Sequence, residues 1–375
     1  MKICLIEPYY TGSHAQWAQG FKDHSRHDVE ILSLNGQYWK WRMHGGAVTL
    51  ARKFMDMNNY PDLILATDML DLSSFLALTR IKTAHIPTAV YFHENQLVYP
   101  WSPTDRDLKH RRDRHYGFIN YVTALAADTV FFNSAFHRRT FLSALTPFLK
   151  HFPDHRELNN IESIAHKSEV LHLGLNLEAL RAHAPRVRHT STTPLVLWNH
   201  RWEYDKNPED FFKVLLLLHE EGVDFEVAIL GENFSQKPEI FDTAQRQLGK
   251  KIVQYGYADS QADYARWLWK ADILPITSNH DFFGASVAEA IFCGCTPLLP
   301  RRLTYPELLP EDEFSRYFYG DMDELKDKLQ HLLTEKNLST DKTAAAMARF
   351  DWKQMAPHYD DAMERCCDRT PSLVQ

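Results

Sequence analysis

Short apolar runs alternate with longer amphipathic stretches along the whole chain. Such alternation predicts βα units built around parallel sheets. In the first half the predicted strands are 2–7, 28–33, 62–66, 88–93, 128–132 and 169–173. In the second half they are 195–199, 225–230, 251–255, 272–275 and 296–299. The pattern therefore predicts an α/β fold with two doubly wound sheets in tandem.

A polar segment interrupts this pattern near the middle of the chain. Residues 181–194 contain two prolines and no apolar run, which is typical of a linker. A chain of 375 residues normally divides into two domains. We expect an N-terminal domain over 1–185, a C-terminal domain over 195–345, and a terminal helix over 346–375 that crosses back to the first domain.

Composition narrows the class of protein. With 44% hydrophobic and 24% charged residues, the chain is not predominantly disordered. No apolar run approaches the roughly 18 residues of a membrane span, and the first strand does not resemble a secretion signal. The five cysteines form no CxxC pair and are expected to be reduced thiols. We expect a cytoplasmic protein with no membrane attachment.

The net charge of −7 hides an asymmetry between the two halves. Residues 1–190 carry 22 Lys and Arg against 18 Asp and Glu, a net charge of +4, and hold 15 of the 20 histidines. The remaining residues carry 20 against 31, a net charge of −11. If either half meets a polyanion, the N-terminal half is the candidate.

Two loops of the first half follow predicted strands, where open α/β sheets bind their ligands. Gly12 lies in the turn after the first strand and permits close backbone approach, or it serves only to form the turn. The segment does not match GxGxxG, which disfavours a dinucleotide site. The polar run His93-Glu94-Asn95-Gln96 follows the fourth strand and either meets a ligand or caps the next element.

A dense charged run occupies residues 105–117. It holds five Lys or Arg and two His among three Asp, and Tyr99, Trp101 and Tyr116 flank or end it. Cations interleaved with aromatic rings suit phosphate backbones and splayed bases. The alternative is a solvated helix face with internal ion pairs.

In the second half, Arg201 and Lys206 follow a predicted strand. Asn207 and Pro208 come next and predict a helix cap with proline at the first helical position. An Arg fork and a Lys point charge beside a helix start suit a diphosphate, unless both are merely exposed loop cations.

The sharpest pattern runs from Asp281 to Pro297. An acid in a turn is followed by Phe282-Phe283-Gly284 and by a small, apolar helix that contains Glu289. A carboxylate on such a helix needs a partner, and ribose hydroxyls are suitable donors. The alternative is a structural buried Glu289.

Together these segments resemble the retaining GT-B glycosyltransferases of family four, the glycogen-synthase-like class. Asp281 and Glu289 match its acid-x7-acid signature, with Asp in place of the usual first Glu. Arg201 and Lys206 match its Arg-x4-Lys spacing, and 174–176 match its GxN element. The resemblance implies two Rossmann-like domains that face each other across a cleft.

A closer resemblance is to the tRNA-queuosine mannosyltransferase family. It is carried by IEPYYTGSHAQW, WKWR (39–42), FHENQLVYPW (92–101), DRD (105–107) and FFNSAFH (131–137). It implies a hexosyltransferase that moves mannose from GDP-mannose, with retention, to the cyclopentenediol of queuosine in the anticodon loop of an aspartate tRNA. The partners implied are this tRNA and the nucleotide sugar.

The resemblance also implies roles for residues. The catalytic set is His93, Arg201, Lys206 and Asp281. The donor-binding set is Gly12, Ser13, His14, Arg201, Lys206, Tyr255, Phe282, Phe283, Gly284 and Glu289. The tRNA-binding set is Trp39, Arg42, Asn95, Arg106, Lys109, Arg111, Arg112 and Arg114, with Tyr38 and Trp41 as further stacking candidates. Neither a cofactor nor a metal is implied, because two cations neutralise the diphosphate.

Two alternatives remain open. The first is a family-four transferase that uses another nucleotide sugar and a glycan or lipid acceptor. The second is a catalytically silent GT-B protein that binds tRNA.

Overall fold

The computed structural model describes residues 1–102, 105, 107, 114–186, 193–231, 237–334 and 340–368. The chain divides into two compact units: unit 1 is Met1–Gly174 with Trp352–Gln375, and unit 2 is Leu175–Asp351. The division therefore falls earlier than the predicted boundary at 185. The reason is that helix α8 (Leu177–Arg181) packs on unit 2, where Trp269 Nε1 donates to the carbonyl of Leu180 at 2.8 Å.

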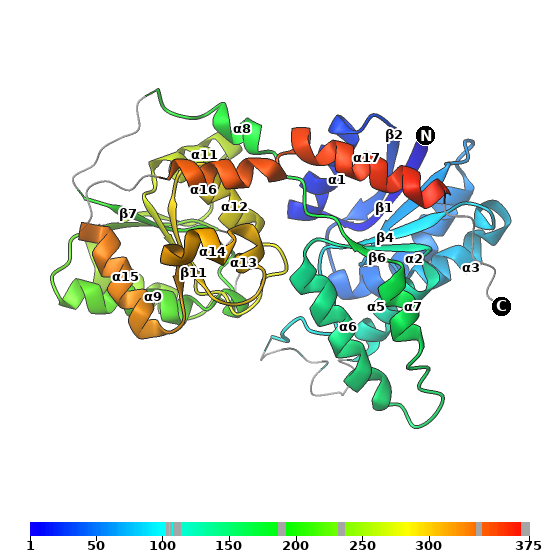
Figure 1. Cartoon of the computed structure of the whole chain (residues 1–375), viewed down its shortest axis with the longest axis horizontal. Helices are drawn as coiled ribbons and strands as arrows, with labels where there is room; N and C mark the ends of the chain where they lie inside the picture. Colours follow the sequence, from blue (N-terminus) through cyan, green and yellow to red (C-terminus); the bar gives the residue numbers. More distant parts are fainter. Residues whose placement is uncertain are drawn as a thin grey trace. The chain divides into compact units, whose positions relative to one another are not determined.

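Unit 1 is built on a six-stranded parallel sheet with the order β2-β1-β3-β4-β5-β6 (Figure 1). Its inner strands are continuous apolar runs that are buried on both faces, as parallel strands covered by helices must be. The order reverses between β1 and β3, which makes this the switch point of the sheet. The strands are β1 (Lys2–Tyr10), β2 (Asp28–Asn35), β3 (Leu63–Thr67), β4 (Thr88–Phe92), β5 (Thr129–Phe132) and β6 (Ser168–Val170).

Helices connect the strands of unit 1 and bury their apolar sides against the sheet. A cluster that includes Phe54, Phe75, Phe92 and Phe141 forms one part of this core. The helices are α1 (Gly12–His24), α2 (Trp39–Met55), α3 (Leu72–Thr83), α5 (Arg114–Ala126), α6 (Ala135–Lys150) and α7 (Asn160–His166).

The last helix, α17 (Trp352–Asp368), lies along unit 1 next to α1 (Figure 1). Trp352 fills the space over two glycines: a Cβ added to Gly20 would lie 2.0 Å from its ring, and one added to Gly174 would lie 2.6 Å away. Tyr359 accepts a hydrogen bond from Trp17 Nε1 at 2.9 Å. The C-terminal helix is therefore part of the core of unit 1.

Unit 2 holds a second six-stranded parallel sheet, with the order β12-β11-β10-β7-β8-β9. Its switch point lies between β7 and β10. The strands are β7 (Leu195–Trp198), β8 (Glu226–Ile229), β9 (Ile252–Tyr255), β10 (Ile273–Pro275), β11 (Thr296–Pro300) and β12 (Phe318–Tyr319). All eleven predicted strands are present, and β12 was missed because a two-residue strand has no periodicity to detect.

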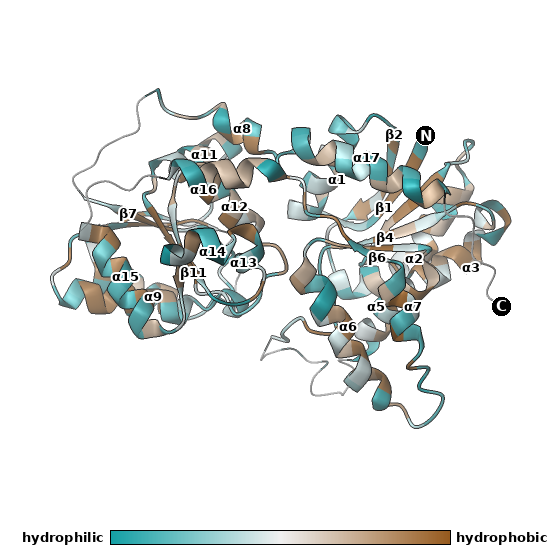
Figure 2. Ribbon diagram, in the orientation of Figure 1, coloured by the Kyte–Doolittle hydropathy of each residue, from teal (hydrophilic) through white to brown (hydrophobic). Residues whose placement is uncertain are grey.

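The helices of unit 2 enclose an aromatic core around Trp198, Trp202, Phe211, Phe212 and Phe241. Apolar residues concentrate on the strands and on the inner sides of the helices (Figure 2). Besides α8, the helices are α9 (Pro208–Glu220), α10 (Ile240–Leu248), α11 (Gln261–Lys270), α12 (Ala285–Phe292), α13 (Tyr305–Leu308), α14 (Glu311–Phe314), α15 (Met322–Thr334) and α16 (Asp341–Met347), with 3₁₀ turns η1 (Tyr204–Lys206), η2 (Gly249–Lys251), η3 (Ser315–Tyr317) and η4 (Ala348–Phe350).

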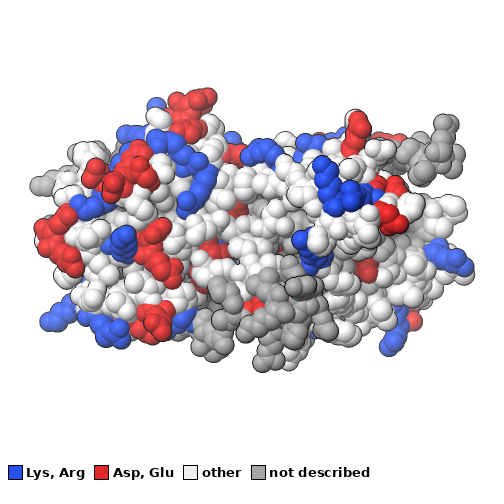
Figure 3. All heavy atoms as spheres, turned by 90° about the horizontal axis from the view of Figure 1, so that it is seen from below, with Lys and Arg blue, Asp and Glu red and all other residues white. Residues whose placement is uncertain are grey.

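The expected α/β class with two doubly wound sheets is confirmed. On the face drawn in Figure 3, acidic side chains gather mainly over unit 2, at the left, in line with the charge balance of the sequence. Among the described residues, no helix combines the length and hydropathy that crossing a bilayer requires. The five cysteines are free thiols.

Candidate functional site

The switch point of unit 2 brings together the two loops that carry the predicted catalytic residues. Lys206 comes from the loop after β7, and Asp281 from the loop after β10. Lys206 Nζ lies 3.0 Å from Asp281 Oδ1 and donates to the carbonyl of His280 at 2.9 Å. Asp205 Oδ2 lies 3.1 Å from the same nitrogen. Two carboxylates therefore share one buried ammonium.

The local sequence explains why Lys206 is held in place. It ends η1, and Asn207 then adopts a left-handed conformation with φ 53°. The Asn207 side chain caps α9 by accepting from the amide of Asp210, with Pro208 in the first turn. The predicted cap is confirmed, and the turn leaves Lys206 at the helix start.

Asp281 is held by two donors. Its Oδ1 pairs with Lys206, and its Oδ2 accepts from the hydroxyl of Tyr305 at 2.6 Å. Burial raises the pKa of Asp281, but the charge of Lys206, a smaller effect of His200 and the hydrogen bonds from Tyr305 and Lys206 together outweigh burial and leave that pKa below its ordinary value. The carboxylate is therefore ionised although it is largely buried.

The segment after Asp281 forms a buried turn into α12. Phe282 and Phe283 are 5% and 4% exposed, and Phe283 packs edge-on against Phe350. Gly284 caps α12 with φ 83°, a conformation that favours glycine. The turn therefore presents backbone, with little side-chain surface, at the start of the helix.

Arg201 is half exposed beside this group. Its guanidinium lies 3.3 Å from a carboxylate oxygen of Glu203. The neighbouring His200 is buried, and burial lowers its pKa to about 4, so that the ring is neutral. His200 Nδ1 lies 3.1 Å from the hydroxyl of Ser286, at the start of α12. Of the two cations predicted to bind the diphosphate, Arg201 is more open to solvent than Lys206.

Glu289, on α12, is half-buried, and its side chain has a partner that the sequence did not indicate. Tyr264, on α11, donates to Glu289 Oε2 at 2.8 Å. Burial raises the pKa of Glu289 to about 7, while the hydrogen bond from Tyr264 opposes that rise. At neutral pH this carboxyl is close to half ionised.

Tyr255 lies elsewhere in unit 2. It ends the edge strand β9, its ring packs edge-on against Trp202, and its hydroxyl lies 3.4 Å from Lys237 Nζ. It shares no ring contact or hydrogen bond with Lys206 or Asp281 among the contacts of the described residues.

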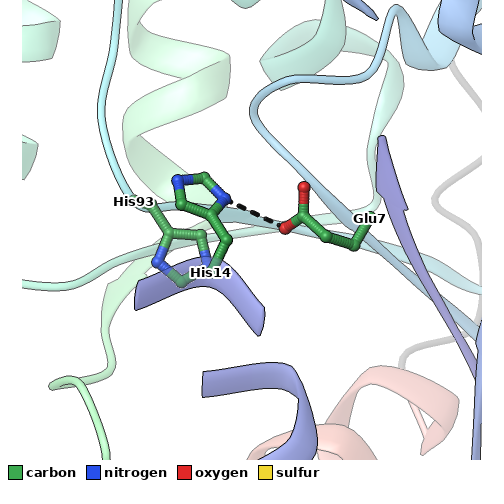
Figure 4. A group of neighbouring side chains, drawn as sticks. All are labelled: Glu7, His14 and His93. Atoms are coloured by element: carbon green, nitrogen blue, oxygen red, sulfur yellow. Dashed lines mark hydrogen bonds and ion pairs between the residues drawn. The ribbon is translucent and has the colours of Figure 1, made fainter. Parts of the chain in front are cut away.

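In unit 1, three side chains meet at the carboxyl ends of β1 and β4 (Figure 4). Glu7 is fully buried in β1; its Oε2 lies 3.0 Å from His14 Nδ1, and its Oε1 accepts from the amide of Tyr9 at 2.8 Å. His93 follows β4, and its ring lies 4.3 Å from the ring of His14. Trp17 packs edge-on against His93 at 4.5 Å.

Gly12 and Ser13 are exposed in the turn that begins α1, directly before His14. Gly12 has φ 50°, and a Cβ placed there would meet no atom within 4 Å. The helix therefore begins in an open position, as the sequence predicts for a turn that a ligand can approach.

The aromatic and charged residues predicted to contact tRNA divide into a framework and a surface. Lys40 Nζ bonds Asp105 at 2.6 Å and Asp107 at 2.5 Å, and it lies over the rings of Trp39, Trp101 and Tyr116. Trp39 is half-buried in this framework and packs 5.1 Å from Tyr116. Tyr38 and Trp41 are instead 76% and 63% exposed.

The remaining predicted tRNA contacts have different settings. Arg42 is half-buried, and its Nε donates to the carbonyl of Asn35 at 3.1 Å. Asn95 is fully buried, and its Oδ1 accepts from the amides of Leu97 and Val98, so it shapes its own loop and offers no surface for direct contact with RNA. This corrects that prediction in favour of the capping alternative.

Arg114 is exposed at the start of α5. The other predicted cations lie outside the described residues: Arg106, Lys109, Arg111 and Arg112.

Three partners of the site escaped the sequence analysis: Glu7, Tyr264 and Tyr305. Glu7 carried a usable signal, because a charged residue inside an apolar strand is costly to bury without a partner. The two tyrosines carried none, since their partners lie 25 and 24 residues away and are set by packing.

Glu7, His14 and His93 are also the described residues whose side-chain ligand atoms all lie within 4.8 Å of one another. A metal requires neutral histidines. Burial lowers the pKa of His14, but the charge and hydrogen bond of Glu7 outweigh burial and raise that pKa to about 9. The group is therefore an ion pair beside a neutral ring.

Comparison with known proteins assigns each half separately. Residues 2–175 match the model of the N-terminal domain of tRNA-queuosine alpha-mannosyltransferase, and residues 181–349 match that of group 1 glycosyl transferases. The tRNA-queuosine alpha-mannosyltransferase of Drosophila melanogaster is 34% identical over 375 residues, which cover 97% of this chain and 96% of that protein.

Solved structures share the fold at much lower identity. Sucrose-phosphate synthase from Thermosynechococcus elongatus has a TM-score of 0.72 at 14% identity, over 99% of this chain and 100% of that one. HepE of Anabaena, in complex with UDP and glucose, has a TM-score of 0.64 at 14% identity, over 97% and 100%. The expected GT-B fold is confirmed.

Proposed function

Because this chain belongs to the family of tRNA-queuosine alpha-mannosyltransferases and is a glycosyltransferase, we propose that it moves mannose from GDP-mannose to the cyclopentenediol of queuosine in the anticodon loop of an aspartate tRNA, with retention at the anomeric carbon. The observation that carries the proposal is the match of the N-terminal residues 2–175 to the domain of that family. The second half alone matches only glycosyl transferases in general.

The chemistry of unit 2 supports a nucleotide sugar as donor. Arg201 and Lys206 supply positive charge that stabilises a diphosphate as it leaves. Asp281 holds Lys206 through one oxygen. Because this carboxylate is charged, it is suited to accept a hydrogen bond from a sugar hydroxyl. Glu289, in its ionised form, accepts ribose hydroxyls. These roles are part of our proposal.

We further propose that the reaction uses neither a cofactor nor a metal. The leaving phosphate takes the proton of the acceptor hydroxyl, so that no separate base is required. The two cations replace the neutralising charge that a metal would supply. The prediction is that activity is unchanged in excess EDTA and that no metal is present in stoichiometric amount in the purified protein.

The acceptor side of the proposal is a queuosine-containing tRNA bound by unit 1. The exposed rings of Tyr38 and Trp41 suit unpaired bases, and the cation-rich sequence 106–114 suits a phosphate backbone. We place this reaction in the cytoplasm, a reducing compartment in which five free thiols persist.

The test is mass analysis of nucleosides from tRNA that carries queuosine. The tRNA is incubated with the protein and, separately, with GDP-mannose, UDP-galactose or UDP-glucose. Added hexose with GDP-mannose alone supports both donor and acceptor. The Asp281→Asn variant and tRNA without queuosine are the controls, and neither should gain hexose.

Other outcomes decide against the proposal. Transfer of hexose from a UDP-sugar would show that GDP-mannose is the wrong donor. Binding of a sugar nucleotide without transfer to tRNA would point to a glycan or lipid acceptor. Binding of tRNA without transfer from any donor would point to a catalytically silent protein.

A further inference from the structure

Glu7 has no role in the function proposed so far, although its partner His14 belongs to the predicted donor-binding set. Glu7 is 0% exposed, and His14 is 9% exposed at the first turn of α1. Both Glu7 oxygens have donors, His14 Nδ1 at 3.0 Å and the amide of Tyr9 at 2.8 Å. The carboxylate is thus fixed in β1, and it fixes the orientation of the imidazole in turn.

The groups that face His14 come from several elements. Asp68, after β3, and Glu94, after β4, add negative charge, while His93 stacks on the ring (Figure 4). Burial and the charge of His14 lower the pKa of His93 well below its ordinary value, and His137, on α6, adds to this. The two stacked rings therefore differ: His14 is charged and His93 is neutral.

The charge on His14 determines what its second nitrogen can do. A neutral ring that donates from Nδ1 to Glu7 would leave Nε2 as an acceptor. A protonated ring carries N–H on both nitrogens, so Nε2 becomes a charged donor. Among the described residues, no side chain or carbonyl bonds His14 Nε2, and the ring is nine-tenths buried.

The start of α1, where His14 lies, suits an anion. The first turn of α1 contains no acidic residue, and its cap residue Thr11 makes no side-chain bond to the helix. The first amides of a helix of thirteen residues lack carbonyl partners and carry the positive end of the dipole. An added Cβ at Gly12 would meet no atom within 4 Å, so a ligand can approach the backbone.

We propose that Glu7 is a positioning residue, which holds His14 through Nδ1 so that Nε2–H and the first turn of α1 bind a phosphate group. The inference rests on the proposed function, which supplies two sources of phosphate: the diphosphate of the nucleotide sugar and the backbone of the tRNA. Glu7 itself does not touch the phosphate. It acts by keeping His14 a donor at the pH of the reaction.

The first experiment measures binding of inorganic pyrophosphate, GDP and tRNA by calorimetry at pH 6.5, 7.5 and 9. We expect Glu7→Gln to lower the affinity for the phosphate ligand about ten- to hundredfold at pH 7.5. This is the range for the loss of a hydrogen bond to a charged group. The loss should be smaller at pH 6.5 than at pH 7.5, because lower pH protonates more of His14, but it should not vanish, because burial lowers the pKa of this ring once residue 7 carries no charge.

The source of the phosphate follows from which ligand is affected. If the variant binds pyrophosphate and GDP more weakly and tRNA with unchanged affinity, the phosphate belongs to the donor diphosphate. If the variant binds tRNA more weakly and GDP with unchanged affinity, the phosphate belongs to the backbone of the tRNA. Asp128→Asn is the matched control, because Asp128 bonds the amide of Thr88 at the opposite end of β4 and should leave all three affinities unchanged.

A double variant tests the dependence of the two residues on each other. His14→Gln should lose as much affinity as Glu7→Gln, and the double variant should lose no more than His14→Gln alone. Additive losses would overturn the inference, as would unchanged affinities and an unchanged pH profile in Glu7→Gln. So would a metal bound by the purified protein and lost in His14→Gln.

Failure of the proposed function would look different. If no hexose reaches tRNA, but Glu7→Gln still weakens pyrophosphate in a pH-dependent manner, the phosphate site stands and the reaction is another. If hexose is transferred and Glu7→Gln is as active as the parent at every pH, the reaction stands and the role of Glu7 is wrong.

Discussion

Lys206 Nζ and Asp281 Oδ1 lie 3.0 Å apart, and each group keeps its charge because of the other. Burial lowers the pKa of Lys206, but Asp281 and Asp205 outweigh it and raise that pKa above its ordinary value. Asp281 is held ionised by the same contact. A buried pair of this kind is costly to break from one side only, because the remaining charge stays in the interior.

Lys206→Ala should therefore reduce stability as well as activity. Removing one partner of a buried pair costs about 3–5 kcal/mol of the free energy of unfolding, to be measured in urea. In the parent, the pKa of Asp281 is lower in the folded state than in the unfolded chain. The ionised carboxylate therefore stabilises the fold at pH values above the ordinary pKa of Asp, and this stabilisation is lost as the pH falls through the lowered pKa. In the variant that carboxyl is buried without its cation, so stability should instead fall as the pH rises.

The double variant Lys206→Ala, Asp281→Ala checks the cause. It removes both charges and should be less destabilised than the sum of the two single variants. Additive effects would mean that the two residues stabilise the fold independently.

Glu289 should give donor binding a pH dependence near neutrality. Its pKa is raised to about 7, so the ionised form that accepts ribose hydroxyls grows as the pH rises through that value. We expect the KM for the nucleotide sugar to fall between pH 6 and 8. Because the Tyr264 hydroxyl lowers this pKa, Tyr264→Phe should move the transition to higher pH.

Pyrophosphate is the control ligand for Glu289, because it contains no ribose. Its affinity should not follow the ionisation of Glu289, whereas that of GDP should. If Tyr264→Phe changes kcat and leaves the pH profile of KM in place, the assignment of Glu289 to ribose is wrong.

Gly20→Ala should destabilise the protein although alanine is the better helix former. The new Cβ would lie 2.0 Å from Trp352 Nε1, so α1 and α17 cannot keep their present packing. Overpacking of this kind costs about 1–3 kcal/mol, measurable as a lower denaturation midpoint. Gln16→Ala, an exposed change on the same helix, should cost little; a stabilised Gly20→Ala would show that α17 yields without cost.

Trp41 and Trp39 should respond differently to substitution. Trp41 is 63% exposed, with its ring over Gly45, whereas Trp39 packs under Lys40. Trp41→Ala should weaken the binding of tRNA by about 1–3 kcal/mol, the free energy of stacking one base, and should leave the stability of the protein unchanged. Trp39→Ala should lower the denaturation midpoint as well.

An exposed ring elsewhere separates stacking from a general effect of surface aromatics. Tyr257 of unit 2 is 71% exposed, and Tyr257→Ala should leave tRNA affinity unchanged. Equal losses in Trp41→Ala and Tyr257→Ala would remove the stacking role.

Much of the fold and part of the site could be predicted because they depend on local order along the chain. Lys206 and Asp281 follow β7 and β10, and carboxyl ends of parallel strands share one edge. The bond between them could not be predicted, because it depends on which loop atoms meet. The same holds for Tyr264 on Glu289.

The sequence patterns misled where a polar side chain serves its own loop. Asn95 stands in a run of polar residues that suits a ligand, yet it is buried and caps Leu97 and Val98. Glu7 shows the converse: it was passed over inside an apolar strand, although burial obliges such a carboxylate to have a partner.

Helix α17 gives unit 1 an unusual order of assembly during synthesis. Trp352 and Tyr359 complete the core around Gly20 and Trp17, yet the ribosome makes them only after the whole of Leu175–Asp351. At translation rates of roughly 5–20 residues per second, unit 1 waits for about 10 seconds or more with that face uncovered. Unit 2, whose chain is continuous, can therefore complete its fold before unit 1, although unit 1 begins the chain.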